Sequence, residues 1–177
     1  MRSRWLAEHS LNKLIFGSTF LAVLDNYVID RLSRRFPTAT PSHLTRLRSV
    51  LVSNSALGYL ALKFLGLHRF ILHSTPLLSE HFNRALEEAE VFVHDDFVSE
   101  IWLFDPPKPA ADSLEGIIGS IFIDCGWKLE PVFEVLDRVF EDLFRLLPHK
   151  ESAPRDPSSR LRLYLQHKQC QASHLNI

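Results

Sequence analysis

The amino-acid sequence predicts an all-α fold, because three features of it agree. Apolar residues recur three and four positions apart along most of the 177-residue chain, which is the spacing that lines one face of a helix. Pro37, Pro41 and Pro76 fall where one such stretch ends or the next begins. No alternation of apolar and polar residues, the pattern of a half-buried strand, lasts long enough to build a sheet.

Proline and glycine bound the first two expected helices. The first follows apolar positions from Phe20 to Leu32 and ends in arginines, which suit the negative end of a helix dipole. Pro37 stops it, and Pro41 starts a second helix whose apolar stripe continues to Phe64. We expect Gly66 to end this long helix as a C-terminal cap.

Three more helices are expected from Pro76 onward. One opens at Pro76 and runs to about Phe104, and a rigid proline-rich connector follows over 105–109. The next covers 110–124 and closes at Cys125-Gly126-Trp127. A last strongly amphipathic helix carries apolar residues from Val132 to Phe144.

These elements predict one folded domain with flanking segments. We expect an N-terminal extension over 1–17, the domain over 18–147, a linker over 148–159 and a short basic C-terminal helix within 160–177. The 46% of hydrophobic residues exclude global disorder, and the length suits a single core.

The composition and the N-terminal sequence also predict the cellular compartment of the protein. Two cysteines cannot make a disulfide framework, which favours a reducing intracellular compartment, cytoplasmic or nuclear. The basic and apolar N-terminus lacks the small-residue cleavage site of a secretory signal, whereas a mitochondrial transit peptide stays open. The longest uncharged stretch in the middle of the chain, Ser49–Leu62, has 14 residues and is too short and polar to cross a membrane.

A net charge of −1 hides basic ends and an acidic centre. Residues 80–142 hold sixteen Asp and Glu against four Lys and Arg, whereas residues 1–50 hold eight Lys and Arg against three acidic residues. The ends could contact phosphates. The acidic segment is typical of a solvated face, and some of its carboxylates could gather a divalent cation.

Asp112 and Glu115 are the first candidates for such a site. They stand three positions apart near the start of an expected helix, so their carboxylates project from one face, with Lys108 one turn upstream. Paired carboxylates suit Mg²⁺. Acidic residues in a first turn also offset the helix dipole, so the spacing alone leaves both interpretations open.

A second candidate is the run His94-Asp95-Asp96, since a tandem His-Asp can ligate a metal in helical phosphohydrolases. The other histidines are scattered, among them His68, His73 and His81 near expected helix ends, so a solvated helix face is the alternative. The sequence contains no Gly-x-Ser-x-Gly elbow, Gly-rich phosphate loop or zinc-spaced cysteine pair.

The segment around Asp112 resembles the second acidic motif of ribonuclease III domains. It reads Lys108-Pro-Ala-Ala-Asp112-Ser-Leu-Glu115-Gly-Ile-Ile-Gly119-Ser-Ile-Phe-Ile-Asp124-Cys-Gly126, against K-x-x-x-D-x-x-E-x-x-x-G-A-x-x-x-D-x-G in the family. Every fixed position matches except the alanine, which is Ser120 here.

Two weaker similarities precede it in the family's order. Leu44-Thr-Arg-Leu-Arg48-Ser-Val-Leu-Val-Ser-Asn54 resembles the helix L-x-x-L-R-x-x-L-V-N-N, and Ala22-Val-Leu-Asp25-Asn26 resembles the end of the first acidic motif in fungal Dicer-like proteins. Residues 156–166 are similar to the first helix of a double-stranded RNA-binding domain, which would be truncated here.

The resemblance implies a helical endonuclease that cuts double-stranded RNA with Mg²⁺, or Mn²⁺ as a substitute. It implies that Asp112 and Glu115 bind the metal, that Lys108 faces a phosphate and that Asn54 supports the site. It also implies pairing with a second ribonuclease III domain, as a homodimer or with another chain. We expect Val23, Tyr27 and Phe64 as candidates for that partner surface, and a place in the core is the alternative for each.

The first acidic motif departs from the family pattern E-F-L-G-D-A-V-L-D. Thr19 stands where the motif has glutamate, and the Gly-Asp pair is missing from Thr19-Phe20-Leu21-Ala22-Val23-Leu24-Asp25. Two of the family's metal-site carboxylates are therefore absent at the aligned positions. An alternative follows: a catalytically inactive ribonuclease III-like module that acts through dimerisation or RNA binding.

Overall fold

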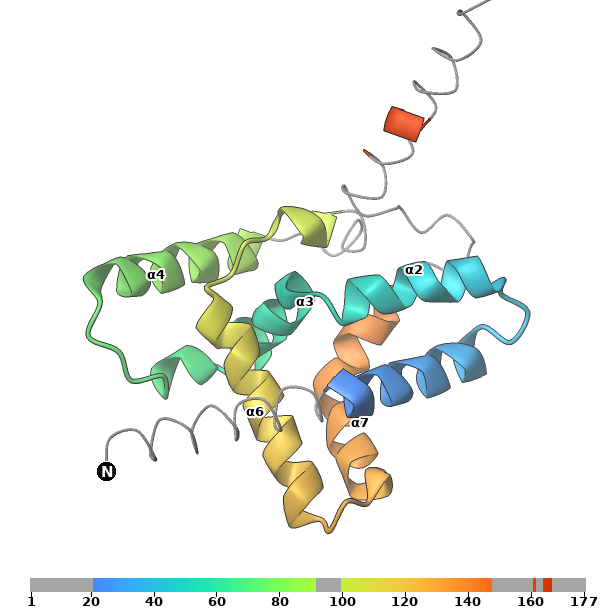
Figure 1. The fold of residues 1–177 in the computed structure, drawn as a ribbon. Coiled ribbons are helices and arrows are strands. Elements are labelled where there is room, and N and C mark those ends of the chain that lie inside the picture. Colours follow the sequence, from blue (N-terminus) through green and yellow to red (C-terminus); the bar gives the residue numbers. More distant parts are fainter. Residues whose placement is uncertain (1–20, 92–99, 148–160, 162–163, 167–177) are drawn as a thin grey trace, which may run out of the picture.

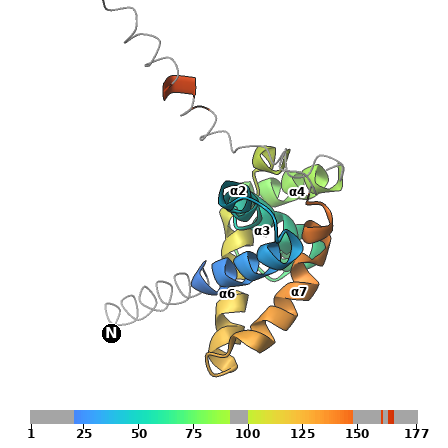
Figure 2. The same ribbon diagram turned by 90° about the vertical axis from the view of Figure 1, so that its right-hand side faces the viewer.

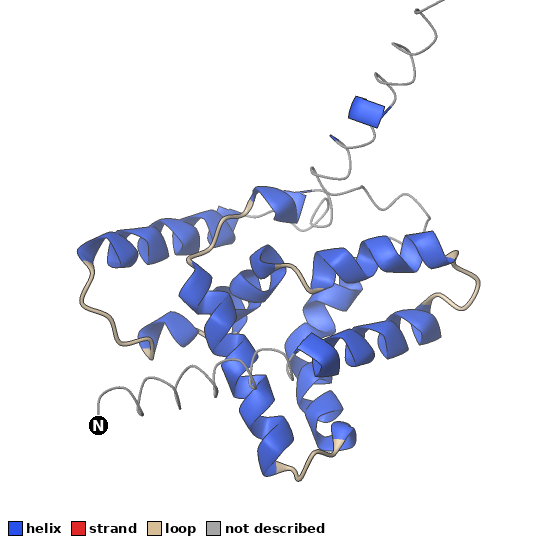
Figure 3. Ribbon diagram, viewed as in Figure 1, coloured by secondary structure: helices blue, strands red, loops and turns tan. Residues whose placement is uncertain are grey.

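A computed structural model describes residues 21–91, 100–147, 161 and 164–166. Every regular element in these ranges is helical and none is a strand, which confirms the predicted all-α class (Figure 3). No helix among the described residues is long and apolar enough to span a bilayer. The expected N-terminal extension, the linker over 148–159 and most of the C-terminal segment lie outside the described residues, so the domain boundaries stay predictions.

The first helix, described over 21–35, and α2 (Pro41–Leu51) form a helical hairpin (Figure 1). Thr40 caps α2, because its side chain accepts a hydrogen bond from the His43 backbone N–H, and Pro41 opens it as predicted. An ion pair of 2.7 Å between Arg48 Nη1 and Asp25 Oδ1 joins the two helices.

The prediction of one long helix from Pro41 to Gly66 is wrong, because the helix is interrupted at Val52 and Ser53. Ser53 has extended backbone angles and caps α3 (Asn54–Tyr59) by accepting from the Ala56 backbone N–H at 3.1 Å. A π-helical turn, η1 (Leu60–Phe64), continues α3. Gly66 does end this run in the left-handed region, with φ of 60°.

The α-helix expected from Pro76 to about Phe104 does not continue to Phe104, because Ile101–Leu103 form a 3₁₀ turn and Phe104 has extended backbone angles. A short turn, η2 (Leu67–Arg69), precedes α4 (Pro76–Val91), and the chain then reaches η4 (Ile101–Leu103) through residues outside the description. The connector before α6 (Lys108–Asp124) contains Pro106 and Pro107, both buried. It approaches α3 so closely that Gly58 has no room for a side chain beside Pro106.

Helices α6 and α7 (Leu129–Arg145) form a second hairpin, which points away from α4 (Figure 1). Cys125 caps α6 as expected, and Gly126 and Trp127 both adopt positive φ, of 66° and 64°. For Trp127 this conformation is unusual, and its ring packs edge-on against Phe122 at 5.4 Å.

An aromatic cluster fixes the first helix against α7, and Figures 1 and 2 show the two helices packed together. The Tyr27 ring lies edge-on to Phe133, Phe140 and Phe144 at 5.3, 5.7 and 6.0 Å. Tyr27 and Val23 are 0% and 3% exposed, so their prediction as partner-facing residues is wrong. Both belong to the core because the first helix turns this face inward. Phe64 is 42% exposed and stays a candidate.

Candidate functional site

The start of α6 places the predicted site residues on one helix face. Lys108 is the first residue of α6, and Asp112 and Glu115 follow four and seven positions later, so all three lie along one side. The adjoining side of α6 buries Ala110, Ala111, Leu114 and Ile118, which holds α6 against α3 and the core. The apolar stripe therefore fixes the direction in which the polar residues point.

Lys108 and Asp112 form a direct ion pair. The Lys108 ammonium donates to Asp112 Oδ1 at 2.5 Å, and the two side chains are 70% and 31% exposed. This bond raises the pKa of Lys108, because the carboxylate stabilises the charged ammonium more than partial desolvation disfavours it. The predicted lysine and the first predicted carboxylate are thus in contact.

Glu115 is half-buried on this face of α6. Burial raises the pKa of its carboxyl, the nearby charge of Asp112 raises it further, and Lys108 opposes the rise. A pair of carboxylates held one turn apart, one of them disfavoured as an anion, is an environment that a divalent cation would stabilise. Mg²⁺ is commonly held by one or two protein carboxylates with waters completing the shell, so the donor set fits it.

Replacing Glu115 with glutamine is expected to stabilise the fold at neutral pH. The native carboxyl has a raised pKa, so the folded state binds more protons than the unfolded state between the ordinary and the raised values. Stability from this group is therefore lost as pH rises through that window. In thermal melts at pH 7, Glu115→Gln should have a higher melting temperature than wild type. This difference should disappear below the ordinary carboxyl pKa of 4.5.

Glu134→Gln, on an exposed position of α7, is the matched control and should leave the melting temperature nearly unchanged. A Glu115→Gln protein less stable than wild type at pH 7 would contradict this picture of the site.

Asn54 is the first residue of α3, and α3 packs against α6. Its side chain is exposed. Among the contacts of the described residues, none joins Asn54 to Lys108, Asp112 or Glu115. The structure therefore places Asn54 on a neighbouring helix without bringing it into the ion-paired group.

The two acidic residues of the first helix have other partners. Asp25 pairs with Arg48, and Asp30 accepts hydrogen bonds from Arg31 and Arg34. Within the described ranges, no group of three or more His, Cys, Asp and Glu side chains is arranged to hold a metal. Thr19, where the family motif has glutamate, lies outside the described residues.

The histidine candidates do not form a second site among the described residues. His94-Asp95-Asp96 falls outside them. The rings of His68 and His73 lie 6.5 and 5.8 Å from that of Phe82, and His81 Nε2 lies 3.0 Å from the backbone oxygen of Asp105. His68 and His73 therefore lie beside α4, and His81 contacts the connector before α6.

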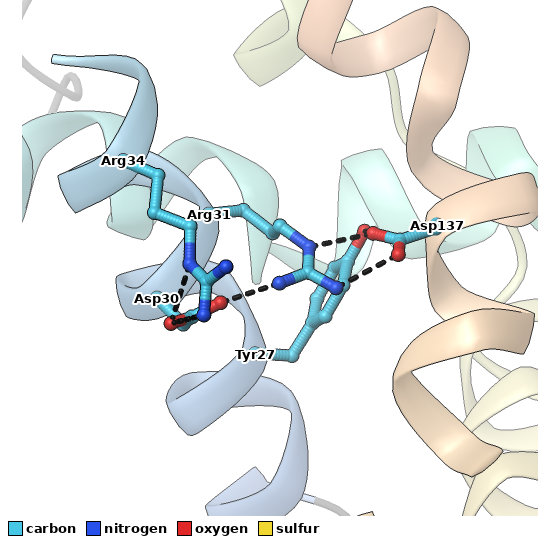
Figure 4. Close-up of polar contacts among 5 residues, drawn as sticks. All are labelled: Tyr27, Asp30, Arg31, Arg34 and Asp137. Atoms are coloured by element: carbon cyan, nitrogen blue, oxygen red, sulfur yellow. Dashed lines mark hydrogen bonds and ion pairs between the residues drawn. The ribbon is translucent and has the colours of Figure 1, made fainter. Parts of the chain in front are cut away.

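Sequence reasoning missed a polar cluster between the first helix and α7 (Figure 4). Arg31 donates two hydrogen bonds of 2.7 Å to Asp137, and the Tyr27 hydroxyl donates to the same carboxylate at 3.1 Å. These bonds hold the pKa of Asp137 below its usual value, whereas burial first and the Asp137 charge second raise that of Tyr27.

The cluster borders an open hollow of about 530 Å³ lined by Arg34, Arg35 and Arg145 among others. In the polar cluster, Asp137 is 106 residues from Arg31 and 110 residues from Tyr27 along the sequence, so no local spacing could have revealed the cluster.

Comparison with known proteins decides the family. The model of the Ribonuclease III domain matches residues 21–126, which includes the first helix, α3 and the whole of α6. The chain belongs to the ribonuclease III domain family. This confirms the resemblance inferred from the α6 motif, and the acidic pair of this ribonuclease III domain lies inside the matched region.

The relatives of this ribonuclease III domain include Dicer proteins of fungi. The chain is 35% identical over 115 residues to Dicer-like protein 1 of Aspergillus terreus and 33% identical over 127 residues to that of Aspergillus niger, covering 63% and 70% of this chain. It is 32% identical over 118 residues, 65% of this chain, to Protein Dicer of Schizosaccharomyces pombe. Each alignment spans 8% of the relative's length.

Proposed function

We propose that this ribonuclease III domain is an endoribonuclease that hydrolyses phosphodiester bonds of double-stranded RNA with a bound Mg²⁺, for which Mn²⁺ can substitute. The observation that carries the proposal is the Asp112–Glu115 pair on one face of α6, inside the region that the family model matches. The names of its relatives, Dicer and Dicer-like protein 1, support RNA processing or silencing as the setting.

Each polar residue of the proposed site would have a separate role. Asp112 and Glu115 would hold the cation, which when bound supplies the Lewis-acid chemistry of phosphodiester hydrolysis. Lys108, whose side chain is 70% exposed, would meet a phosphate of the substrate. Asn54, exposed at the start of the neighbouring helix, would support RNA binding.

A-form geometry would select the substrate. Duplex RNA is recognised mostly through its shape, its phosphates and its 2′-hydroxyl groups, so we expect little dependence on base sequence. The domain would pair with a second ribonuclease III domain, either another copy or one on a different chain. The exposed Phe64 is a candidate contact for that partner. An intracellular location, with a mitochondrial one left open, stays a prediction from composition.

One observation favours the inactive alternative. Both acidic residues of the described first helix, Asp25 and Asp30, are paired with arginines, and neither contributes a third carboxylate to α6. A site with two carboxylates would hold a cation less firmly than the family's larger set. The module would then act through dimerisation or duplex binding.

Labelled long RNA duplex and the matching single strand, each incubated with purified protein and Mg²⁺, separate the two functions. Cutting of the duplex alone supports the nuclease. A folded helical protein that binds duplex or self-associates, yet cuts neither RNA, supports the inactive module. Cutting of the single strand at an equal rate would contradict recognition of A-form shape.

A further inference from the structure

The Asp112 carboxylate at the start of α6 has two competing partners. Asp112 Oδ1 accepts a hydrogen bond from the Lys108 ammonium at 2.5 Å, and Asp112 is also one of the two proposed ligands for the divalent cation. A carboxylate neutralised by an ammonium attracts a second cation less strongly, because the lysine charge repels it.

We infer that Lys108 is an exchangeable counter-ion of Asp112, which competes with the divalent cation and is drawn away by a phosphate of the duplex. This inference rests on the proposed function and adds a regulation of the same site. It means that cation binding and duplex binding favour one another.

Separating the Lys108–Asp112 pair requires little free energy, because the pair is exposed and lies within one helix. The pair joins residues four apart on one helix, and the Lys108 side chain is 70% exposed. Exposed pairs of this kind contribute little to stability, so a stronger partner can replace either member. Pro107 precedes Lys108 and Pro109 follows it, so the backbone is restrained and the flexible side chain makes the movement.

The surroundings of Glu115 make Lys108 the residue that must move. The negative charge of Glu115 is disfavoured by burial and by the nearby charge of Asp112. Lys108 reduces this repulsion, so it stabilises the acidic pair in the absence of another cation. A divalent cation held by Asp112 and Glu115 would provide the same compensation more fully, which would leave the ammonium available to a phosphate.

The test measures Mn²⁺ binding without RNA, by the loss of the free-ion electron paramagnetic resonance signal. Lys108→Met should bind Mn²⁺ more tightly than wild type, by roughly threefold to tenfold, since a competing positive charge is removed. Lys128→Met removes the same charge beyond the far end of α6 and should change the affinity little. Equal or weaker binding in Lys108→Met overturns the inference, as does absence of Mn²⁺ binding in every protein.

The second arm measures the affinity for a phosphorothioate RNA duplex, which resists cutting, with and without saturating Mn²⁺. Wild type and Lys128→Met should bind duplex several-fold more tightly with Mn²⁺, whereas Lys108→Met should lose most of this gain, because coupling free energies are reciprocal. An unchanged gain in Lys108→Met overturns the inference. The cleavage assay is read separately, so a protein that cuts duplex with Mg²⁺ but lacks this coupling keeps the proposed function and loses only the exchange.

Discussion

Gly58→Ala is expected to destabilise the fold by about 2 kcal/mol, although alanine is the better helix former. A Cβ atom at position 58 would lie 2.3 Å from Cγ and 2.6 Å from Cβ of Pro106. The proline ring is buried and rigid, so α3 and the connector before α6 would have to separate. Urea denaturation followed by circular dichroism measures the change.

Gly116→Ala is the matched control, because a Cβ there meets nothing within 4 Å. It should stabilise α6 by about 0.5–1 kcal/mol through helix propensity alone. Opposite signs for the two alanine substitutions are the expected result. A stabilising Gly58→Ala would contradict the close approach of α3 to Pro106.

Phe140→Ala should have the larger effect on the core, a loss of about 3–5 kcal/mol. Phe140 is 0% exposed on α7, and its ring lies 5.7 Å from Tyr27 and 6.4 Å from Phe144. Removing it leaves a cavity between the first helix and α7 that the remaining rings cannot fill. The same denaturation experiment measures the loss.

Phe70→Ala controls for the removal of an aromatic ring, since Phe70 is 76% exposed, and it should change stability by less than about 0.5 kcal/mol. Similar stability losses in the two variants would be inconsistent with an aromatic core centred on Tyr27.

Local sequence signals predicted the ends of helices well where proline or glycine determines the backbone conformation. Pro41 and Pro76 begin α2 and α4, and Gly66 takes the left-handed conformation expected of a stop. The break at Ser53 escaped prediction because the apolar residues before and after it fall on one continuous helical stripe. A serine cap was present in the sequence, but periodicity outweighed it.

Long-range contacts could not be predicted in the same way. Val23 and Tyr27 look like surface residues when only their own helix is considered, and the aromatic side chains of α7 bury Tyr27. The pairing of Asp25 with Arg48, and of Arg31 with Asp137, depends on how helices pack. The Lys108–Asp112–Glu115 face was predictable because its residues share one helix.

Cleavage of a long labelled RNA duplex as a function of Mg²⁺ concentration, by wild type and by Glu115→Ala, tests the central claim most directly. The site on α6 predicts cutting that requires Mg²⁺ in wild type and falls at least about a hundredfold in Glu115→Ala, with the helical spectrum retained. Cutting that persists in Glu115→Ala, or that needs no divalent cation, would contradict a metal site built on Asp112 and Glu115.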